Sequence, residues 1–213
     1  MTPAFDLSVY LVLDPDLCEP LGMVETAVQA VKGGTTLVQL RDKNGTTARR
    51  IEVGRALMHA LDGSGVPVII NDDVDAAKAV DAHGAHVGQD DTAAAEARAL
   101  LGPDKILGVS CERPELAAAI DANVVDYIGA GPVFTTATKS DHKAPIGFDG
   151  LAAIVGVSPV PTVAIGGVKH DHAAEILASG AQGLAVVSAI CGRPDPCRAA
   201  RVLAHAVSQG RPK

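Results

Sequence analysis

Thr36-Leu-Val-Gln-Leu-Arg-Asp-Lys43 is a short apolar run that passes directly into charged residues, and a segment of helical composition follows it. The same unit recurs along the chain, giving eight apolar runs at residues 8–13, 36–40, 66–70, 84–87, 105–109, 125–128, 162–165 and 183–187. Short β-branched runs separated by alanine-rich segments are typical of parallel strands buried on both faces, with crossover helices outside. The sequence therefore predicts an α/β fold, a single (β/α)8 TIM barrel that occupies residues 1–213 as one domain.

Helices are expected between the strands, at residues 24–32, 47–61, 74–82, 92–101, 114–122, 150–155, 172–178 and 196–207. Two of them carry start signals, because Asp91 or Thr92 can cap the fourth helix and Pro114 can occupy the first turn of the fifth. The interval from Gly129 to Gly147 is far longer than the roughly two to six residues usual for a β/α loop. A loop of this length in a compact barrel is usually functional and often a lid, and the sequence leaves open whether this one acts as a lid.

The composition excludes several classes of partner. Hydrophobic residues make up 47% of the chain, enough to fill a barrel, but with Trp 0, Tyr 2 and Phe 3 there are too few aromatic residues for a platform that stacks nucleic-acid bases. The formal net charge of -7 also opposes attraction to polyanions. The cysteines show no CxxC pairing, and no apolar run approaches about 18 residues. We therefore expect a cytoplasmic protein with reduced thiols and with no nucleic-acid or membrane partner.

The residues that follow the predicted strands matter most, since the active site of this fold is built at the carboxyl ends of the strands. Gln39, Arg41 and Lys43 lie at the end of the second strand, and alternation along a strand puts all three on one side, toward the barrel mouth. Arg41 can hold two phosphate oxygens, and Lys43 can add a point charge. The alternative is a surface basic pair balanced by Asp42, which the position at a strand end disfavours.

A magnesium site is predicted where the third and fourth strands end. Asn71 and Asp72 follow one strand and Asp91 follows the next, and neighbouring strands lie about 4.8 Å apart. Carboxylates from both can therefore bracket one Mg²⁺, which prefers one or two carboxylates together with water and substrate phosphate oxygens. Asp73 is expected to begin a helix, and helix capping is the alternative for the whole Asn-Asp-Asp segment.

Two further segments are predicted to hold an anion. In the long loop, Thr136 and Thr138 offer hydroxyls and amides and Lys139 offers a charge; an ordinary threonine-rich turn is the alternative. Gly166-Gly167 follows the seventh strand and Val187-Ser188 ends the eighth, and loops at these two places supply the usual phosphate cradle of a barrel. Glycines that serve only a tight turn are the alternative at this second place.

The remaining chemistry-bearing residues predict no other site. His86 is expected in the barrel interior, and His142, His170 and His172 are expected in loops or at helix starts. No HxH, HExxH or Cys/His spacing indicates zinc, and no G-x-S-x-G segment indicates a serine nucleophile. The residues alone thus predict two anion sites and one Mg²⁺ at a single barrel mouth, a convergence that favours an enzyme over a binding module.

Taken together, these segments resemble the thiamine phosphate synthase family. The motifs that carry the resemblance cover nearly the whole chain and read Tyr10-Leu-Val-Leu-Asp14, Gln39-Leu-Arg-Asp-Lys43, Ile70-Asn-Asp-Asp73, His86-Val-Gly-Gln-Asp-Asp91, Gly108-Val-Ser110, Gly129-Ala-Gly-Pro-Val-Phe134, Thr136-Ala-Thr-Lys139, Ala164-Ile-Gly-Gly-Val168 and Val186-Val-Ser-Ala-Ile190. The resemblance implies a transferase of thiamine biosynthesis. Its reaction condenses 4-amino-5-hydroxymethyl-2-methylpyrimidine pyrophosphate with 4-methyl-5-(2-hydroxyethyl)thiazole phosphate, or the carboxylated form of the latter, to thiamine phosphate and releases pyrophosphate.

The resemblance also implies a role for each matching residue. The implied ligands of the pyrimidine pyrophosphate are Gln39, Arg41, Lys43, Asn71, Ser110 and Lys139, and those of the thiazole phosphate are Thr136, Thr138, Gly167, Val187 and Ser188. Asp72 and Asp91 are the implied ligands of the cofactor Mg²⁺. The implied catalytic residues are Arg41, Lys43, Ser110 and Lys139. In the implied mechanism pyrophosphate departs from the methylene carbon and leaves a carbocation that the thiazole nitrogen attacks, without a covalent enzyme nucleophile.

The sequence departs from the family pattern at two places and leaves rival functions open. Cys111-Glu112 stands where the family commonly has Thr-His, and Thr135 stands where proline is usual. The related thiazole tautomerase is the nearest rival, because Glu112 can transfer a proton, but a tautomerase would leave the Mg²⁺ and pyrophosphate residues without use. A barrel that only senses a thiamine intermediate is a third hypothesis. Pyrophosphate release separates the three, and a homo-oligomer stays open for all of them.

Overall fold

Eight parallel strands close into a barrel in the computed structural model, which describes residues 5–88, 92–136 and 144–211. The strands pair in chain order from β1 to β8, and β8 returns to β1, where Tyr10 lies in register with Ala185. Their bounds are β1 Val9–Leu13, β2 Leu37–Leu40, β3 Val68–Asn71, β4 Gly84–Val87, β5 Ile106–Cys111, β6 Tyr127–Ala130, β7 Thr162–Ile165 and β8 Gly183–Val186. The predicted α/β class and (β/α)8 barrel are therefore confirmed.

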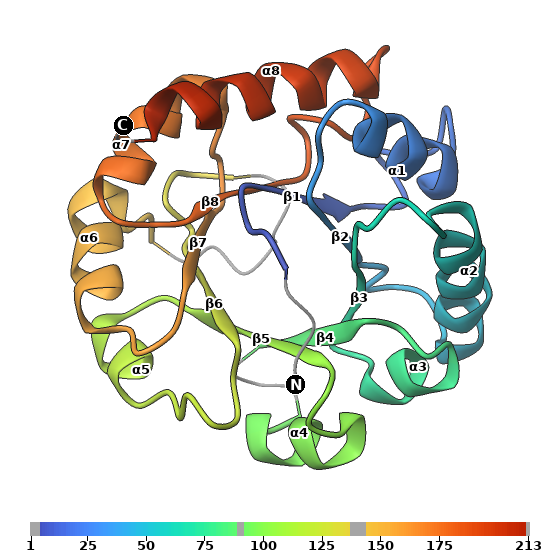
Figure 1. The fold of residues 1–213 in the computed structure, drawn as a ribbon, viewed down its shortest axis with the longest axis horizontal. Coiled ribbons are helices and arrows are strands. Elements are labelled where there is room, and N and C mark those ends of the chain that lie inside the picture. The colour runs from blue at the N-terminus through green and yellow to red at the C-terminus, as the bar shows by residue number, and fades with distance from the viewer. Residues whose placement is uncertain (1–4, 89–91, 137–143, 212–213) are drawn as a thin grey trace.

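The helices form a ring around the strands (Figure 1). Their bounds are α1 Met23–Lys32, α2 Thr47–Ala60, α3 Val74–Ala79, α4 Ala94–Leu101, α5 Pro114–Ala118, α6 Gly147–Val157, α7 Ala173–Ala178 and α8 Pro196–Gly210, with a 3-10 turn η1 His170–His172 ahead of α7. Each helix from α1 to α7 joins the end of one parallel strand to the start of the next, as a crossover connection must. The last helix, α8, packs against both α7 and α1 and so closes the ring (Figure 1).

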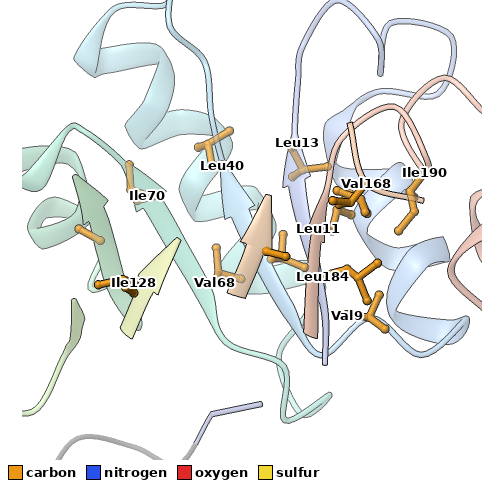
Figure 2. Packing of buried hydrophobic residues seen from close by; sticks show 14 of the residues in the cluster. Val9, Leu11, Leu13, Leu40, Val68, Ile70, Ile128, Val168, Leu184 and Ile190 are labelled. Carbon is orange, nitrogen blue, oxygen red and sulfur yellow. The ribbon is translucent and has the colours of Figure 1, made fainter. Parts of the chain in front are cut away.

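Alternation along each strand divides the core in two. Leu11, Leu40 and Ile70 point outward into the layer between strands and helices, part of which Figure 2 shows. A smaller cluster fills the barrel itself with Leu7, Tyr10, Val12, Leu37, Ile69, Ile106, Tyr127, Val163 and Ala185. Full burial of one Leu or Ile side chain stabilises the folded chain by about 1.5–3 kcal/mol relative to leaving it exposed. Because the side-chain period of a strand is two, interior Leu37 places Gln39 and Arg41 above it, toward the barrel mouth.

The helix starts agree with the sequence signals in two cases and disagree in one. Asp73 caps α3, and Pro114 occupies the first turn of α5, as predicted. The helix α4 begins only at Ala94, and its N-cap Ala93 has no side-chain oxygen with which to accept a hydrogen bond. The predicted cap by Thr92 is therefore wrong, and the other cap candidate lies outside the described residues.

Several further boundaries differ from the prediction, and at two of them a side-chain contact accounts for the difference. The helix α5 ends at Ala118, earlier than expected, because the Asp121 carboxylate accepts a hydrogen bond from the Asn123 N–H (2.9 Å) and starts a turn that competes with the helix. The strand β6 begins at Tyr127, later than expected. The residue before it, Asp126, instead uses its carboxylate to accept from the Leu107 N–H (2.7 Å) on β5.

No helix in the described ranges is both long enough and apolar enough to cross a membrane. The cysteines are all free thiols, and Cys18, Cys111 and Cys191 are buried.

Candidate active site

One cavity of about 1220 Å³ opens at the carboxyl ends of the strands. Ten residues predicted from the sequence line it, namely Gln39, Arg41, Lys43, Asn71, Asp72, Ser110, Thr136, Gly167, Val187 and Ser188. The other three, Asp91, Thr138 and Lys139, lie outside the described residues. The structure thus brings every predicted site residue that it describes to the same cavity.

The end of β2 places a guanidinium deep in the cavity wall. Gln39 and Arg41 are buried, with 3% and 8% of their surface exposed, and Lys43 lines the cavity beyond them. Among the residues that the structure describes, Arg41 has an ion pair with Asp14 at the end of β1, whose carboxylate lies 3.8 Å from a terminal nitrogen. At this separation the pair is long for a hydrogen-bonded ion pair, so the guanidinium keeps donors for a bound anion. Little water surrounds the Arg41 guanidinium, which strengthens its attraction to phosphate, whereas the Lys43 side chain is exposed.

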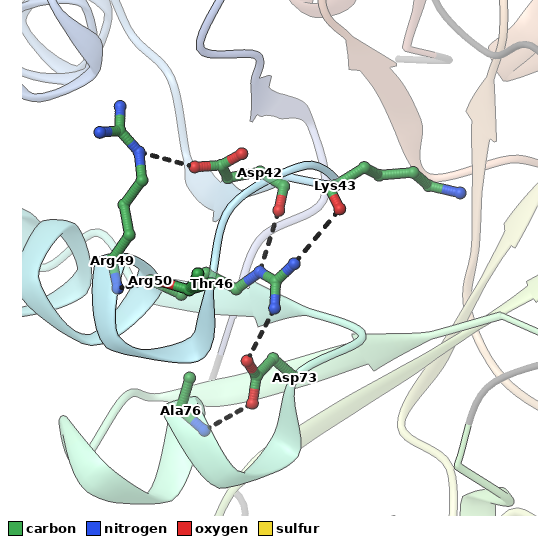
Figure 3. Close-up of polar contacts among 7 residues, drawn as sticks. All are labelled: Asp42, Lys43, Thr46, Arg49, Arg50, Asp73 and Ala76. Atoms are coloured by element: carbon green, nitrogen blue, oxygen red, sulfur yellow. Dashed lines mark hydrogen bonds and ion pairs between the residues drawn. The ribbon is translucent and has the colours of Figure 1, made fainter.

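Arg50 ties the loop after β2 to the turn after β3 (Figure 3). Its Nε donates to the Asp42 carbonyl (2.9 Å), and one terminal nitrogen donates to the Lys43 carbonyl (3.4 Å). Its other terminal nitrogen lies 2.9 Å from the Asp73 carboxylate, in a pair with 18% and 10% of the side chains exposed. Arg50 thereby holds the backbone that carries Lys43 against the backbone that carries Asp72.

The Asp73 carboxylate is stabilised in its charged form. Partial burial alone raises the pKa of Asp73, but hydrogen bonds from the Ala76 N–H and from Arg50 outweigh burial and hold that pKa below its ordinary value. A carboxyl with a lowered folded-state pKa stabilises the fold above its unfolded pKa, about 3.9, and loses this contribution as the pH falls through the folded pKa.

A pH-dependent stability difference is therefore expected for Asp73→Asn. Its free energy of unfolding should lie below that of the wild type by a constant amount from about pH 8 to pH 5, and the two should converge below about pH 4. Urea unfolding at a series of pH values measures the difference. A gap that widens in acid would contradict the stabilised carboxylate.

Asp72 lies in an unusual backbone conformation at the end of β3. Its φ of 62° belongs to the left-handed region, which Asp and Asn tolerate better than other side chains do. The Asp72 N–H donates to the His86 carbonyl (2.8 Å), so β4 helps to hold this turn. Strained residues held at a cavity wall are typical of functional sites.

The oxygen donors beside this turn fit a sparsely ligated Mg²⁺. Asn71 and Asp72 both line the cavity, and Mg²⁺ takes one or two carboxylates and completes its shell with water and substrate oxygens. Within the described residues, no group of three or more His, Cys, Asp or Glu could hold a metal ion by protein ligands alone. The second predicted ligand, Asp91, lies outside the described residues.

The glycine pair after β7 allows two chain segments to touch. Gly166 and Gly167 have φ of 95° and 66°. A Cβ on Gly166 would come 2.6 Å from the Pro132 Cα, and a Cβ on Gly167 would come 2.8 Å from the Thr135 carbonyl oxygen. Only glycine meets both the positive φ and this close approach. The pair therefore holds the loop that leads to the predicted Thr136 against the end of β7.

A single helical turn follows β8 at the cavity wall. The N–H groups of Ile190 and Cys191 both donate to the Val187 carbonyl, at 3.0 and 2.9 Å. The first N–H groups of such a turn have no acceptor within it and suit a phosphate. Val187 and Ser188 line the cavity at this point, and Arg193, which donates from Nε to the Ser188 carbonyl (2.9 Å), adds a positive charge.

The predicted interior position of His86 is confirmed. The imidazole is 8% exposed and lies 3.0 Å from the Ser110 hydroxyl through Nε2 and 2.9 Å from the Tyr127 hydroxyl through Nδ1. Cys111 at the end of β5 does not line the cavity and packs in the layer between strands and helices, and burial and then the Glu112 charge raise the pKa of its thiol to about 11.

Several cavity residues were missed from the sequence, namely Tyr10, Asp14, Asp16, Phe134, Lys169, His172 and Arg193. Alternation from Tyr10 through Val12 to Asp14 could have found the first two, since the three residues point to one side of β1. No local pattern could have found the contact of Phe134 with His172, whose rings lie 4.4 Å apart between centroids. That contact joins the loop after β6 to η1 and exists only in the folded chain.

Residues 9–190 match the family model described as thiamine monophosphate synthase. The chain belongs to this family. It is 46% identical over 211 residues to the thiamine-phosphate synthase of Azorhizobium caulinodans and 47% identical over 211 residues to that of Xanthobacter autotrophicus, in each case covering 99% of this chain and 100% of the relative. Membership of the family makes the chain an enzyme, a transferase of thiamine biosynthesis with small-molecule substrates.

The solved structures agree with this assignment. Thiamine phosphate pyrophosphorylase from Pyrococcus furiosus superposes with a TM-score of 0.85 at 35% identity, over 95% of this chain and 96% of that chain. A 3-hexulose-6-phosphate synthase superposes with a TM-score of 0.71 over 94% of this chain and 99% of that chain, but at 19% identity it shows the fold alone.

Proposed function

We propose that this enzyme condenses the aminopyrimidine pyrophosphate with the thiazole phosphate, or its carboxylated form, to give thiamine phosphate and pyrophosphate. One observation carries the proposal: a single cavity of about 1220 Å³ is lined both by the cationic end of β2 and by the glycine pair and helical turn after β7 and β8. A diphosphate and a monophosphate need two such anion sites, and a condensation needs both substrates in one cavity.

The pyrimidine pyrophosphate is assigned to the side of the cavity formed by β2, β3 and β5. Arg41, Lys43 and Asn71 would hold the pyrophosphate oxygens, since all three line the cavity and Arg41 is held in a poorly solvated wall. Gln39 and Ser110 would contact the pyrimidine ring. Lys139 is kept in this group from the family resemblance alone.

The thiazole phosphate is assigned to the ends of β7 and β8. Gly167, Val187 and Ser188 would bind it through backbone N–H groups, and Thr136 would add its hydroxyl or amide. Thr138 is kept in this group from the family resemblance alone. The two assignments together place the thiazole ring between its phosphate cradle and the pyrimidine.

The reaction requires no covalent bond to the protein. The bond from the methylene carbon to the pyrophosphate oxygen breaks with its electron pair leaving on pyrophosphate, and the lone pair of the thiazole nitrogen forms the new C–N bond. Arg41, Lys43 and Lys139 would stabilise the departing negative charge, and Ser110 would orient the pyrimidine. Mg²⁺, held by Asp72 and Asp91 when bound, would add positive charge at the pyrophosphate.

Pyrophosphate release tests the proposal against its rivals. Purified enzyme with Mg²⁺ should release pyrophosphate only when both substrates are present, and omission of the thiazole phosphate should stop sustained release. A tautomerase or a sensor would bind ligand and release none. Glu112 lines the cavity, so a Glu112→Gln variant belongs in the same assay: the synthase reaction should keep its rate, whereas a proton-transfer reaction should lose it.

Arg50→Ala is expected to weaken the pyrophosphate site without entering it. Loss of the guanidinium frees the carbonyls of Asp42 and Lys43, so the backbone that carries Lys43 is no longer held in place. We therefore expect the KM for the pyrimidine pyrophosphate to rise by about tenfold, which corresponds to a lost interaction of roughly 1.4 kcal/mol. Arg49→Ala is the matched control. Arg49 pairs with the Asp42 carboxylate at 3.0 Å but is 57% exposed, so its loss should change KM less than about twofold. Equal effects of the two variants would contradict a specific positioning role.

Cytoplasmic location, the lack of a nucleic-acid partner and homo-oligomer formation stay predictions. Size-exclusion chromatography with light scattering measures the last of these directly.

A further inference from the structure

A carboxylate faces the guanidinium that we assign to pyrophosphate. Leu13 on β1 lies in register with Leu40 on β2, so the residues that follow them, Asp14 and Arg41, leave neighbouring strands side by side. The Asp14 carboxylate lies 3.8 Å from a terminal nitrogen of Arg41, and both residues line the cavity. The side chains of Asp14 and Arg41 are 16% and 9% exposed. The pair is therefore poorly solvated and lies at the wall of the proposed pyrophosphate site.

Arg41 needs a negative charge nearby when the site is empty. An arginine side chain keeps its charge in proteins, so the cost of its burial cannot be relieved by loss of a proton. A buried charge left without a partner is strongly destabilising. Among the described residues, Asp14 makes the one ion pair of Arg41. Asp14 therefore supplies the charge that balances Arg41 before a substrate arrives.

The turn after β1 keeps the two groups from closing into a tight pair. One oxygen of the Asp14 carboxylate, Oδ1, accepts from the Leu17 N–H (3.1 Å), and the Asp14 carbonyl accepts from the Cys18 N–H (3.0 Å). Asp14 is thus tied to its own loop through both side chain and backbone. Its other oxygen, Oδ2, lies 3.8 Å from Arg41, which is longer than a hydrogen bond. A phosphate oxygen that approaches to about 2.8 Å would make a stronger, charge-assisted bond to the same guanidinium.

We infer that Asp14 is a positioning residue that serves as the counter-anion of Arg41 in the empty site and lowers the affinity of the site for pyrophosphate by competing for the guanidinium. The inference rests on the proposed function, in which Arg41 holds the pyrophosphate oxygens. Both Asp14 and pyrophosphate are negative, so each weakens the hold of the other on Arg41 by the same factor. A carboxylate that takes back the guanidinium favours release of the leaving group, a step that limits many enzymes.

Asp14→Asn tests the inference through the binding of inorganic pyrophosphate. The amide oxygen can still accept from the Leu17 N–H, so the turn is retained while the negative charge is lost. At a fixed Mg²⁺ concentration, the Kd for pyrophosphate measured by calorimetry should fall by at least about fivefold. The unliganded variant should unfold about 2–4 °C below unliganded wild type, because Arg41 is left without its partner, and saturating pyrophosphate should remove most of this difference.

Asp16→Asn is the matched control. Asp16 lies in the same loop and lines the cavity, but it is exposed and has no ion pair among the described residues. Water and salt screen an exposed charge, so at an ionic strength of about 0.15 M the removal of this carboxylate should change the Kd for pyrophosphate less than about twofold.

A folded Asp14→Asn variant that binds pyrophosphate no more tightly than wild type would overturn the inference, because a residue with only a structural role would not tighten binding when removed. Should this variant fail to fold, Asp14→Ser, whose hydroxyl can accept from the same turn, repeats the measurement. If wild type released no pyrophosphate from the two substrates, the proposed function would fail, and the two values of Kd would still decide the inference. If wild type bound no pyrophosphate at all, both would fail.

Discussion

Replacement of Asp72 by asparagine is expected to lower kcat by about 10²- to 10³-fold while leaving the fold intact. The variant removes one of two proposed carboxylate ligands of Mg²⁺ at the pyrophosphate, and loss of one strong electrostatic contact in an active site costs about this much. Asparagine is chosen because it tolerates the φ of 62° at this position, so that backbone strain does not enter the comparison. Steady-state pyrophosphate release over a range of Mg²⁺ concentrations measures the effect, and thermal unfolding checks the fold.

Asp75→Asn is the matched control for this prediction. Asp75 lies exposed in the first turn of α3, three residues farther along the chain, and lines no part of the cavity. Its removal should change kcat less than about twofold. If Asp72→Asn kept the wild-type rate and Mg²⁺ dependence, the assignment of Asp72 to the metal would be wrong.

Gly167→Ala is expected to raise the KM for the thiazole phosphate by about 10²-fold and to lower the free energy of unfolding by about 1–3 kcal/mol. The new Cβ would lie 2.8 Å from both the Phe134 Cβ and the Thr135 carbonyl oxygen, and φ is 66°. The loop that leads to Thr136 must therefore move away from the phosphate cradle. Steady-state kinetics with the thiazole phosphate varied and urea unfolding measure the two effects.

Gly156→Ala makes the same substitution at a position where we expect the opposite effect on stability. Gly156 lies in α6, and a Cβ added there meets nothing within 4 Å. Alanine is favoured over glycine inside a helix by about 0.5–1 kcal/mol, so this variant should be slightly more stable with an unchanged KM. A wild-type KM in Gly167→Ala would remove the glycine pair from the proposed phosphate cradle.

The barrel and the location of its site could be predicted because both depend on local patterns. Apolar runs of four to six residues predict the strands. The side-chain period of two along β2 then places Gln39 and Arg41 on the interior side, without any knowledge of the other strands. The ends of parallel strands then meet at one face in every barrel of this class. Prediction from sequence therefore succeeds for features that a single segment determines by itself, such as a strand and the side on which its residues lie.

The supporting contacts could not be predicted because each joins segments far apart in the chain. Arg50 on α2 reads as an ordinary surface helix residue, yet it binds Asp73, 23 positions away. Tyr10 and Tyr127 read as core aromatics, and their hydroxyls meet across 117 positions. Such pairs depend on the register of strands and on the space left by glycines such as Gly108, which no local pattern encodes.

The most direct test of the proposed chemistry is an isotope experiment on the wild-type enzyme. The pyrimidine pyrophosphate is labelled with ¹⁸O at the oxygen that bridges the methylene carbon and phosphorus, and the products formed with the thiazole phosphate and Mg²⁺ are analysed by mass spectrometry. We expect thiamine phosphate and pyrophosphate in equal amounts, with all of the label in pyrophosphate. Absence of thiamine phosphate, or label retained on a hydroxymethylpyrimidine, would contradict the substitution at carbon on which the account rests.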